Sequence, residues 1–360
     1  MSGQETHLGS CRVAVAILNW NGLAHLQRFL PSVLAHTGAS DRVVIIDNGS
    51  TDESVDWLVQ TAPEVHVVSL DDNHGFAGGY NRGLETLKAQ LDFDWVVLLN
   101  SDVEVTEGWL NGLVSACEEH GWSAAQPKMR AVEKRAEFEY AGAAGGYMDR
   151  NGFMFCAGPL FHENELDHGQ YDADRPVFWA SGASLLVQAD AWFSVGGLDE
   201  DFFAHMEEID LCWRLRNRGH VVGSTGRCHV YHLGGGTLQH ENPRKAFLNF
   251  RNNLFLLLKN DHRAGIRAHI LWRQVLDGIA GLRFLLEGKR DFFMAVIRAH
   301  GDYRRQRGTM MDKRRLEIKT CSDVKRSAAS MAGQYQGSIV WDFFIRSRRK
   351  WSDLPQDRFS

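Results

Sequence analysis

The sequence predicts an α/β fold with a mainly parallel central sheet, and a series of short apolar runs carries that prediction. The runs cover residues 13–18, 43–46, 65–70 and 95–99. Apolar runs of this length, rich in β-branched residues, are typical of parallel strands that are buried on both faces. Segments with helical spacing separate the runs, and such alternation produces parallel sheets with right-handed crossovers. Ligands of these sheets bind beyond the carboxyl ends of the strands.

The first helix is expected directly after the turn Asn19-Trp20-Asn21-Gly22. Its apolar face has helical spacing and consists of Leu26, Phe29, Leu30, Val33 and Leu34. Residues 129–170 are rich in glycine and have little periodicity, so we expect long loops and short strands there. A regular pattern returns over residues 178–187, and helices are expected over 189–195 and from Glu207 onward.

Helical segments dominate beyond Gly236, which predicts a boundary near residue 240. A catalytic domain, 1–240, would then be followed by a helical region, 241–360. One helix of this region carries an amphipathic stripe, made of Leu271, Val275, Ile279, Leu282 and Leu286. Because such a stripe is more often part of a core than a membrane face, we expect it to pack against the protein.

The composition is that of a soluble globular protein, with 44% hydrophobic and 24% charged residues among 360. The formal net charge of −5 is small, so nothing indicates a nucleic-acid partner. From Arg298 onward, however, basic residues outnumber acidic ones. Two interpretations of this basic end stay open: contact with an anionic surface such as lipid head groups, or a solvated helical face.

The six cysteines are scattered without a C-x-x-C pair, which fits free thiols in a reducing compartment and argues against a structural zinc site. The first residues lack a basic-then-apolar signal pattern, and no apolar run has the length of a membrane span. We therefore expect a cytoplasmic protein, and peripheral attachment to the inner face of the plasma membrane stays open.

The first chemical signal is Asp47, at the end of the second expected strand. A carboxylate there can accept the imide N–H of uracil or thymine. The alternative is a turn, because Asp-Asn-Gly-Ser is strong turn chemistry. A glycine-rich segment, 73–83, follows the next strand and allows backbone to lie close to an anion at a helix start. It could equally reflect tight helix–sheet packing, and it is not the dinucleotide fingerprint.

The second signal is Asn100-Ser101-Asp102, which follows another apolar strand. The Asp102 carboxylate can hold a divalent cation that bridges two phosphates, and oxygen ligands suit Mg²⁺ or Mn²⁺. Such a metal would neutralise a departing diphosphate. Alternatively, Asp102 caps the turn that follows it. His232 stands before a run of glycines and could complete a metal site or touch a phosphate, although most histidines do neither.

The third signal is the acidic cluster Glu207, Glu208 and Asp210 at an expected helix start. The structural explanation is that these acids gain from the helix dipole and that Asp210 pairs with Arg214 four residues on. Beside aromatic side chains, the same acids can supply a general base with a raised pKa, which a hydroxyl acceptor needs. Glu208 is the candidate base, and Glu207 stays open as the alternative.

Together and in this order, the clusters between residues 13 and 237 resemble the inverting family 2 glycosyltransferases with the GT-A fold. The matching segments are Leu18-Asn19-Trp20-Asn21-Gly22, Asp47-Asn48-Gly49-Ser50-Thr51-Asp52, Gly75-Phe76-Ala77-Gly78-Gly79 with Asn81, Leu99-Asn100-Ser101-Asp102, Ser181-Gly182-Ala183, Gly196-Gly197-Leu198-Asp199-Glu200, Glu207-Glu208-Ile209-Asp210-Leu211, and His232 with the glycines after it. Each segment is weak evidence, and their joint order is specific. The subgroup most resembled is the rhamnosyltransferase-like set that acts on bacterial surface polysaccharides. The resemblance implies a Rossmann-like sheet flanked by helices, with a helical C-terminal extension.

The resemblance also implies roles for single residues. Nucleotide binding falls to Asn19, Asp47, Asn73, Gly78, Asn81 and Ser101. A divalent cation, Mg²⁺ or Mn²⁺, falls to Asp102, the last acid of the family's D-x-D motif, and to His232. The base falls to Glu208, the second acid of the family's E-D pair, with Glu207 as the other candidate. Two departures matter, because Asn100 replaces the first acid of D-x-D and glutamate replaces the usual aspartate at 208.

The implied reaction is a single displacement by a hexosyltransferase-type enzyme, with inversion at the anomeric carbon. Glu208 would take the acceptor proton while the metal stabilises the leaving nucleotide diphosphate. The implied donor is a UDP- or dTDP-sugar, and the acceptor is a saccharide or a lipid-linked saccharide in surface polysaccharide or glycolipid assembly. Asn100 keeps one rival open, a nucleotide-sugar-binding protein with impaired catalysis. A nucleotide-sugar pyrophosphorylase would carry a basic loop after the first strand, and residues 19–22 contain no lysine or arginine.

Overall fold

The computed structural model describes residues 9–140, 142–161, 163–234 and 242–360. The first part of the chain contains β1 (Ser10–Asn19), α1 (Leu23–Ala35), β2 (Arg42–Asp47), α2 (Ser54–Thr61), β3 (His66–Ser69), α3 (Gly75–Gln90), β4 (Asp92–Asn100), β5 (Val103–Val105), α4 (Trp109–His120), β6 (Ala124–Ala131), β7 (Gly146–Asp149), β8 (Met154–Cys156), β9 (Arg175–Pro176), β10 (Ser184–Gln188), α5 (Ala189–Val195), α6 (Glu207–Asn217) and β11 (Val222–His232). The rest contains α7 (Pro243–Asn260), α8 (Ile266–Leu286), α9 (Arg290–Thr320), α10 (Ala328–Met331), β12 (Gln334–Tyr335) and α11 (Ile339–Phe344).

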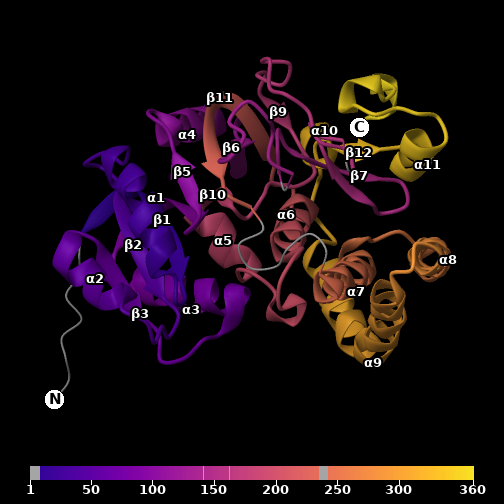
Figure 1. The fold of residues 1–360 in the computed structure, drawn as a ribbon, viewed down its shortest axis with the longest axis horizontal. Coiled ribbons are helices and arrows are strands. Elements are labelled where there is room, and N and C mark those ends of the chain that lie inside the picture. The colour runs from indigo at the N-terminus through magenta and orange to yellow at the C-terminus, as the bar shows by residue number, and fades with distance from the viewer. Residues whose placement is uncertain (1–8, 141, 162, 235–241) are drawn as a thin grey trace.

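The central sheet has the strand order β3-β2-β1-β4-β10-β6-β11-β5, and β9 pairs with β11 (Figure 1). Strands β3, β2, β1 and β4 are parallel to one another, and β6 is parallel to β11. Strands β10, β5 and β9 run antiparallel to their neighbours. The sheet is therefore largely parallel, as predicted. The four apolar runs of the sequence form its first four strands.

Side chains of the central strands alternate between two hydrophobic cores, one on each face of the sheet. In β1, Ala14 and Ala16 belong to one core, and Val13, Val15 and Ile17 belong to the other. Helices α3, α5, α6 and α7 complete the first core, and α1, α2 and α4 complete the second. Burial on both faces explains why these strands read as continuous apolar runs.

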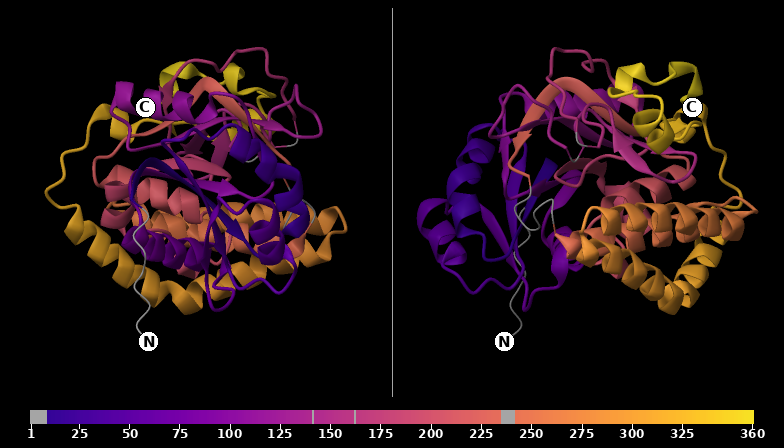
Figure 2. Two further views of the ribbon diagram at one scale, coloured as in Figure 1. Left: turned by 90° about the vertical axis from the view of Figure 1, so that its left-hand side faces the viewer. Right: turned by 45° about the vertical axis from the view of Figure 1, so that its right-hand side comes forward.

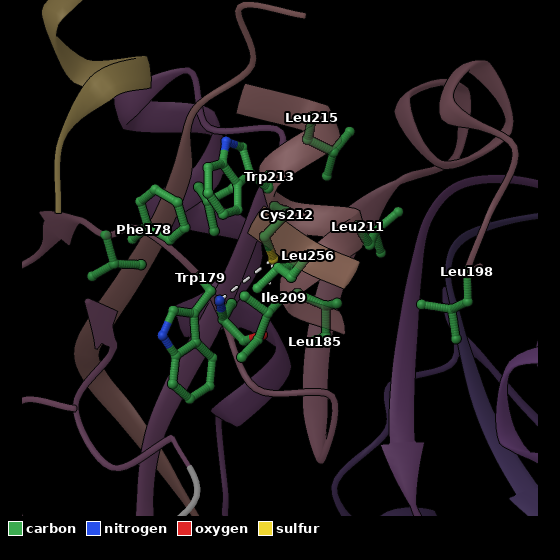
Figure 3. Packing of buried hydrophobic residues seen from close by; sticks show 14 of the residues in the cluster. Phe178, Trp179, Leu185, Leu198, Ile209, Leu211, Cys212, Trp213, Leu215 and Leu256 are labelled. Atoms are coloured by element: carbon green, nitrogen blue, oxygen red, sulfur yellow. Dashed lines mark hydrogen bonds between the residues drawn. The ribbon is translucent and has the colours of Figure 1, made fainter. Parts of the chain in front are cut away.

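Helix α6 lies in the middle of the first core. Its apolar side chains pack among residues that precede β10 and against α7, as Figure 3 shows for Ile209, Leu211, Cys212, Trp213, Leu215, Phe178 and Leu256. The rings of Phe178 and Trp213 meet edge to face at 5.0 Å between centroids. The amide of Ala180 donates a hydrogen bond to the Cys212 sulfur at 3.4 Å. All six cysteines have free thiols.

One strand begins later than expected. The regular pattern over residues 178–187 predicts a single element, but β10 starts only at Ser184. The amide of Ser184 donates to the carbonyl of Ser181 at 3.3 Å, which makes a turn over Ser181-Gly182-Ala183. This turn places Gly182 beside Glu208, at the start of α6.

The helical region packs on the sheet domain rather than standing apart from it. The predicted boundary near residue 240 falls within residues 235–241, which lie outside the described part of the chain. Helix α7 is buried along its second half, and Leu254 to Leu258 belong to the first core. Helices α7, α8 and α9 lie together (Figure 2), and β12 pairs with β7 near the C-terminus.

The expected packing of the α8 stripe is wrong. Its five residues are exposed, from 48% for Val275 to 89% for Leu286. The buried face of α8 consists of Ile266, Ile270, Arg273, Asp277 and Gly281. This face includes an ion pair, because Nε of Arg273 lies 2.8 Å from Oδ1 of Asp277. Apolar spacing alone could not reveal that the ion-paired face turns inward. Among the described residues, no helix is long and apolar enough to cross a bilayer.

Candidate active site

The predicted site residues gather at the carboxyl edge of the sheet. Strands β1, β2 and β4 end at Asn19, Asp47 and Asn100, and the register pairs Asn19 with Asp47. Leu18 pairs with Asn100 on the other side of β1. Strand β11 ends at His232, which pairs with the residue after Asp102. Parallel strands thus deliver polar side chains to one edge, where ligands of such sheets bind.

Asn19 and Asp47 form a buried polar pair at this edge. Nδ2 of Asn19 donates to Oδ1 of Asp47 at 3.1 Å, and also to the hydroxyls of Ser50 and Ser54. Oδ2 of Asp47 accepts from the amide of Ser50 at 3.2 Å, so Asp47 does make the turn contact. Its side chain is nearly buried, yet a carboxylate that accepts two hydrogen bonds keeps further lone pairs for a donor. Oδ1 of Asn19 is buried without a hydrogen-bond partner among the described residues.

Asn48 holds the glycine-rich segment in place, a role that the sequence pattern did not indicate. Its Nδ2 donates to Oδ1 of Asn73 at 3.0 Å and to the carbonyl of Gly75, and its Oδ1 accepts from the amide of His74. A side chain at Gly79 would lie only 2.7 Å from Leu18. The tight helix–sheet packing that the sequence left open is therefore present at Gly79.

Asn81 and Gly78 contact the loop that precedes the acidic helix. Nδ2 of Asn81 donates to the carbonyl of Leu198 at 2.8 Å, and Oδ1 accepts the amide of the same residue at 2.9 Å. The amide group of Asn81 thus clamps the Gly196-Gly197-Leu198 loop. A side chain at Gly78 would approach Glu200 at 3.3 Å. Ser101 is half-buried in the turn between β4 and β5.

Asp102 and His232 meet although they are far apart in sequence. Nε2 of His232 lies 3.3 Å from Oδ1 of Asp102, and Nδ1 of His232 lies 3.5 Å from Oε2 of Glu139. All three side chains are nearly buried. Burial opposes the charge on the imidazole, but the two carboxylates raise the pKa of His232 to about 10. Burial would raise the pKa of Asp102, but the hydrogen bond and charge of His232 lower it.

These donors could supply part of the coordination of a divalent cation. A carboxylate and an imidazole lie together, and the second imidazole nitrogen faces a carboxylate, the usual outer partner of a metal-bound histidine. Within the described residues, no group of three His, Cys, Asp or Glu side chains is arranged to hold a metal ion. A cation here would therefore take its other ligands from water and a diphosphate.

Glu139 is the site residue that the sequence pattern missed. It lies in the glycine-rich middle of the chain, where its amide donates to the carbonyl of Met129 at 3.0 Å. The neighbouring Phe138 forms an antiparallel bridge with Arg130 of β6. This short pairing carries Glu139 along the sheet to His232. No motif around residue 139 signals such a role, because the partner comes from β11.

Glu208 is connected to the turn that contains Asp102 through Gly182 and Ala183. The amide of Asn100 donates to the carbonyl of Ala183 at 3.0 Å. A side chain at Gly182 would lie 3.3 Å from Cβ of Glu208, so this glycine allows the glutamate to approach. Part of the Glu208 side chain is accessible, and the surrounding protein raises its pKa to about 7, chiefly by burial.

Glu207 has a different environment. Its side chain is buried, and Oε2 has no hydrogen-bond partner among the described residues. Burial, and then the charge of Glu208, raise the pKa of Glu207 well above its usual value. A raised pKa and burial both make Glu207 harder to deprotonate and to reach. Of the two candidates, Glu208 is the more exposed to solvent.

The backbone before this acidic pair is strained. Phe203, His205 and Met206 have φ values of 66°, 67° and 72°, which side chains other than glycine rarely adopt. Asn252 of α7 holds the turn, because its Nδ2 donates to the carbonyls of Phe202, Ala204 and His205 at 3.0, 2.8 and 2.7 Å. The C-terminal helices thus help to position the acids.

Asp210 has the structural role that its spacing suggested. Oδ2 of Asp210 accepts from Nε of Arg214 at 2.7 Å and from Nζ of Lys259 at 2.9 Å. Oδ1 accepts from Asn260, also of α7. Arg214 further donates to the carbonyls of Val195 and Gly197. Asp210 is completely buried in this network and is not available to a substrate.

Comparisons with known proteins point to one class. Residues 14–148 match the model of the family described as Glycosyl transferase family 2. The chain is 28% identical over 279 residues to the N-acetylglucosaminyl-diphospho-decaprenol L-rhamnosyltransferase of Mycobacterium tuberculosis, covering 72% of this chain and 87% of that protein. It is 25% identical over 213 residues to the low-salt glycan biosynthesis hexosyltransferase Agl10 of Haloferax volcanii, covering 58% of this chain and 64% of that protein.

A solved structure shares the fold. The crystal structure of GalNAc-T7 with UDP, GalNAc and Mn²⁺ superimposes with a TM-score of 0.52 at 17% identity, covering 69% of this chain and 48% of that one. At this identity the likeness concerns the fold alone. The shared fold is the GT-A arrangement of a largely parallel sheet flanked by helices.

Proposed function

We propose that this chain, a glycosyltransferase with a family 2 domain and the GT-A fold, transfers a hexose from a UDP- or dTDP-sugar to an acceptor hydroxyl with inversion. One observation carries the proposal. Glu208, a partly exposed residue whose pKa is raised to about 7, packs against Gly182, and the next residue, Ala183, is bonded through its carbonyl to Asn100 of the Asn100-Ser101-Asp102 turn. A base and a phosphate-binding carboxylate at one sheet edge are what such a displacement needs.

The nucleotide would lie over the ends of β1, β2 and the start of α3. In this proposal Asp47, held by Asn19, accepts the imide N–H of the base. Backbone at Asn73 and Gly78 lines the diphosphate at the α3 N-terminus, where free amides favour anions. Asn81 acts through the Leu198 loop that it clamps. The nucleotide contact is completed by Ser101, next to the metal-binding carboxylate.

A divalent cation, Mg²⁺ or Mn²⁺, would be held by Asp102 and His232. When bound, it would neutralise the nucleotide diphosphate as that group leaves. Glu139 would fix the orientation of the His232 ring through Nδ1. Because the two carboxylates raise the pKa of His232, metal binding would have to compete with a proton for this imidazole. Asn100, at the first position of the D-x-D pattern, has a neutral amide oxygen, which would accept a hydrogen bond from water at this site.

Glu208 would act on the acceptor. Its carboxylate takes the hydroxyl proton while the oxygen attacks the anomeric carbon from the face opposite the diphosphate. No bond to the enzyme forms, so the anomeric configuration inverts. The names of the relatives support an acceptor in glycan assembly, either a saccharide or a lipid-linked saccharide. With a lipid-linked acceptor, the reaction would occur at the cytoplasmic face of a membrane, and the basic C-terminal region supports peripheral contact there.

A thermal-shift screen of nucleotide sugars, with and without Mn²⁺, tests the donor and the metal together. At a free ligand concentration of 100 Kd, a bound donor adds about 2.7 kcal/mol to the free energy of unfolding, which is a clear rise in Tm. One UDP- or dTDP-sugar should shift Tm most, and Mn²⁺ should increase that shift. The proposal fails if no nucleotide sugar raises Tm with or without the metal.

Turnover separates the proposal from the rival of a binding protein with impaired catalysis, which Asn100 favours. The donor found above is incubated with acceptor saccharides, and NMR assigns the anomeric configuration of any product. An inverted product that disappears in Asp102→Ala and Glu208→Gln supports the proposal. If the donor binds but is neither transferred nor hydrolysed, the result supports the rival.

A further inference from the structure

Helix α8 presents an apolar face to solvent. Seven of the 20 large hydrophobic side chains that are exposed in the described part of the chain lie on this one helix. They are Leu271, Trp272, Val275, Ile279, Leu282, Leu285 and Leu286. Monomeric soluble proteins rarely expose apolar patches that extend over a whole helix face, and such patches usually mark an interaction site.

This exposure does not result from incomplete packing of α8. At about 100° per residue, the five stripe residues from Leu271 to Leu286 span an arc of about 80°. The buried residues, from Ile266 to Gly281, lie on the opposite side of the helix and face α7 and α9. Helix α8 is therefore fully docked on one side, and the stripe is a second face that no described element covers.

Helix α11 extends the same surface. Trp341, Phe344 and Ile345 are exposed by 55%, 37% and 61%. The guanidinium of Arg283, on α8, lies 5.0 Å from the centre of the Phe344 ring, so the two helices meet at this point. In Figure 1, α8 stands at the right-hand edge of the molecule with α11 above it. We name the exposed residues of α8 and α11 together the α8 face.

Positive charge borders the α8 face. Arg267 lies one turn before Leu271 in the same row of the helix, and Arg283 lies at its side. Lys289 and Arg290 follow the end of α8. Both acids of this segment are engaged: Asp277 is buried against Arg273, and Glu287 pairs with Arg283. Basic side chains outnumber acidic ones along this rim, so its net charge is positive.

The wider region has the same sign. Residues 242–360 contain 25 lysines and arginines against 11 aspartates and glutamates, whereas the whole chain has a net charge of −5. The positive charge is therefore concentrated in the part of the chain that carries the α8 face. Its complement is an anionic partner.

We propose that the α8 face docks on an anionic lipid bilayer, with α8 lying in the plane of the interface. An apolar helix face with flanking arginine and tryptophan is the pattern of helices that insert into the boundary between head groups and acyl chains. The indole of Trp272 keeps its Nε1–H bonded to Asn151, so the ring is held at the rim. Arg267 and Arg283 would contact the phosphates.

A second copy of the chain is a poorer partner for this face. A two-fold interface brings each patch against itself, so the basic rims of two copies would oppose each other. Like charges in such an arrangement disfavour association. A bilayer would bury the apolar face and attract the basic rim through its phosphates. We therefore choose the bilayer over the dimer.

This inference deepens the proposed function, because a lipid-linked acceptor would be presented at the same surface. The inference is tested by vesicle binding, which requires no catalytic activity. The full chain is floated with phosphatidylcholine vesicles and with vesicles in which part of this lipid is replaced by phosphatidylglycerol. We expect binding at least about tenfold tighter to the anionic vesicles, weakened by salt.

Variants locate the binding surface. Ile279→Asp and Leu282→Asp should each weaken vesicle binding by at least about tenfold, because a carboxylate would enter the apolar boundary. Arg267→Glu should weaken it and reduce its dependence on salt. Val59→Asp is the matched control, since Val59 is 65% exposed on α2, far from α8 in Figure 1, and should bind like the original chain. All four positions are solvent-exposed, so the Tm of each variant should be unchanged.

Two outcomes overturn the inference. One is that the chain does not bind anionic vesicles, or that Ile279→Asp and Leu282→Asp bind as well as Val59→Asp. The other is sedimentation as a dimer that Ile279→Asp dissociates, without vesicle binding, which would assign the face to a second copy. Donor binding in the thermal-shift assay is independent of both outcomes, so failure here would leave the proposed reaction standing.

Discussion

Nε2 of His232 lies 3.3 Å from Oδ1 of Asp102, although 130 positions separate the two residues. The antiparallel pairing of β11 with β5 produces this contact, because it aligns His232 with Val103. The amide of Leu233 also donates to the carbonyl of Asp102 at 3.1 Å, which fixes the register. A metal site at these two residues would therefore be held in place by backbone pairing as well as by side chains.

The position of Glu139 predicts that it tunes metal binding through His232. Glu139→Gln keeps the size of the side chain but removes the negative charge that faces Nδ1. Loss of such an outer partner lowers metal affinity about 10–100-fold. We therefore expect Mn²⁺ to bind at least about tenfold more weakly in the presence of the nucleotide, measured by electron paramagnetic resonance of free Mn²⁺.

Glu137→Gln is the matched control, because Glu137 belongs to the same segment and bonds to Asn164 instead. Its Mn²⁺ affinity should equal that of the original chain. If Glu139→Gln and Glu137→Gln bind Mn²⁺ equally well, Glu139 does not position the ligand.

The two glutamates at the start of α6 should differ in their effect on catalysis. Glu208→Gln removes the accessible carboxylate, and the loss of a general base lowers kcat by about 10²–10⁴-fold. Donor binding should persist, because the acid lies on the acceptor side of the proposed reaction. Glu207→Gln, at the buried neighbour, should reduce kcat far less. Steady-state transfer rates give kcat, and titration gives the donor Kd, for both variants. Equal losses of kcat in the two variants would contradict the assignment of Glu208 as the base.

The raised pKa of Glu208 predicts the pH dependence of transfer. Only the deprotonated carboxylate accepts a proton, so kcat should rise with pH and level off above about 7. The contribution of Glu208 to the free energy of unfolding changes in the opposite direction and falls as pH rises. Because the folded-state pKa lies above the usual 4.5, the folded protein binds this proton more tightly than the unfolded chain.

This stability contribution is present below pH 4.5 and is lost as pH rises through 7. Glu208→Gln removes a partly buried charge, so at pH 8 it should increase the free energy of unfolding, by on the order of 2 kcal/mol. Urea denaturation at pH 5 and pH 8 measures this. A variant with the same gain at both pH values, or with an unshifted pH–rate profile, would show that Glu208 does not titrate near 7.

The fold was predictable from the sequence where one periodicity dominates. The strands β1, β2 and β4 are buried on both faces, so their apolar runs have one interpretation, and the polar residues at their ends follow directly. Helix α8 was not predictable, because both of its faces have helical spacing. The choice between them depends on the Arg273–Asp277 pair and on the helices that cover it.

The candidate site was also predictable only in part. Glu208, Asp102 and His232 stand in recognisable local patterns, and the structure brings Asp102 and His232 together. Glu139 and Asn252 carry no local signal, since each acts on residues about 50 to more than 90 positions away. Contacts between distant segments follow from strand pairing and helix packing, which a single sequence does not display.

Asn252 is predicted to support catalysis by holding the strained turn before Glu207 and Glu208. Its Nδ2 bonds to three carbonyls of that turn, so Asn252→Ala leaves them unsatisfied and allows Phe203, His205 and Met206 to relax. We expect kcat to fall at least about tenfold, since a base displaced by about 1 Å can lose about 10²-fold in rate. The free energy of unfolding should also fall by about 1–3 kcal/mol.

Asn253→Ala separates the effect on catalysis from the effect on stability. Asn253 is the neighbouring buried amide of α7, and its Nδ2 donates to the carbonyl of Gly152 at 2.8 Å, away from the acidic pair. It should lose a similar free energy of unfolding, measured by urea denaturation, while keeping kcat at temperatures where both variants are folded. Equal losses of kcat in the two variants would mean that α7 supports the fold as a whole and that Asn252 does not position Glu208.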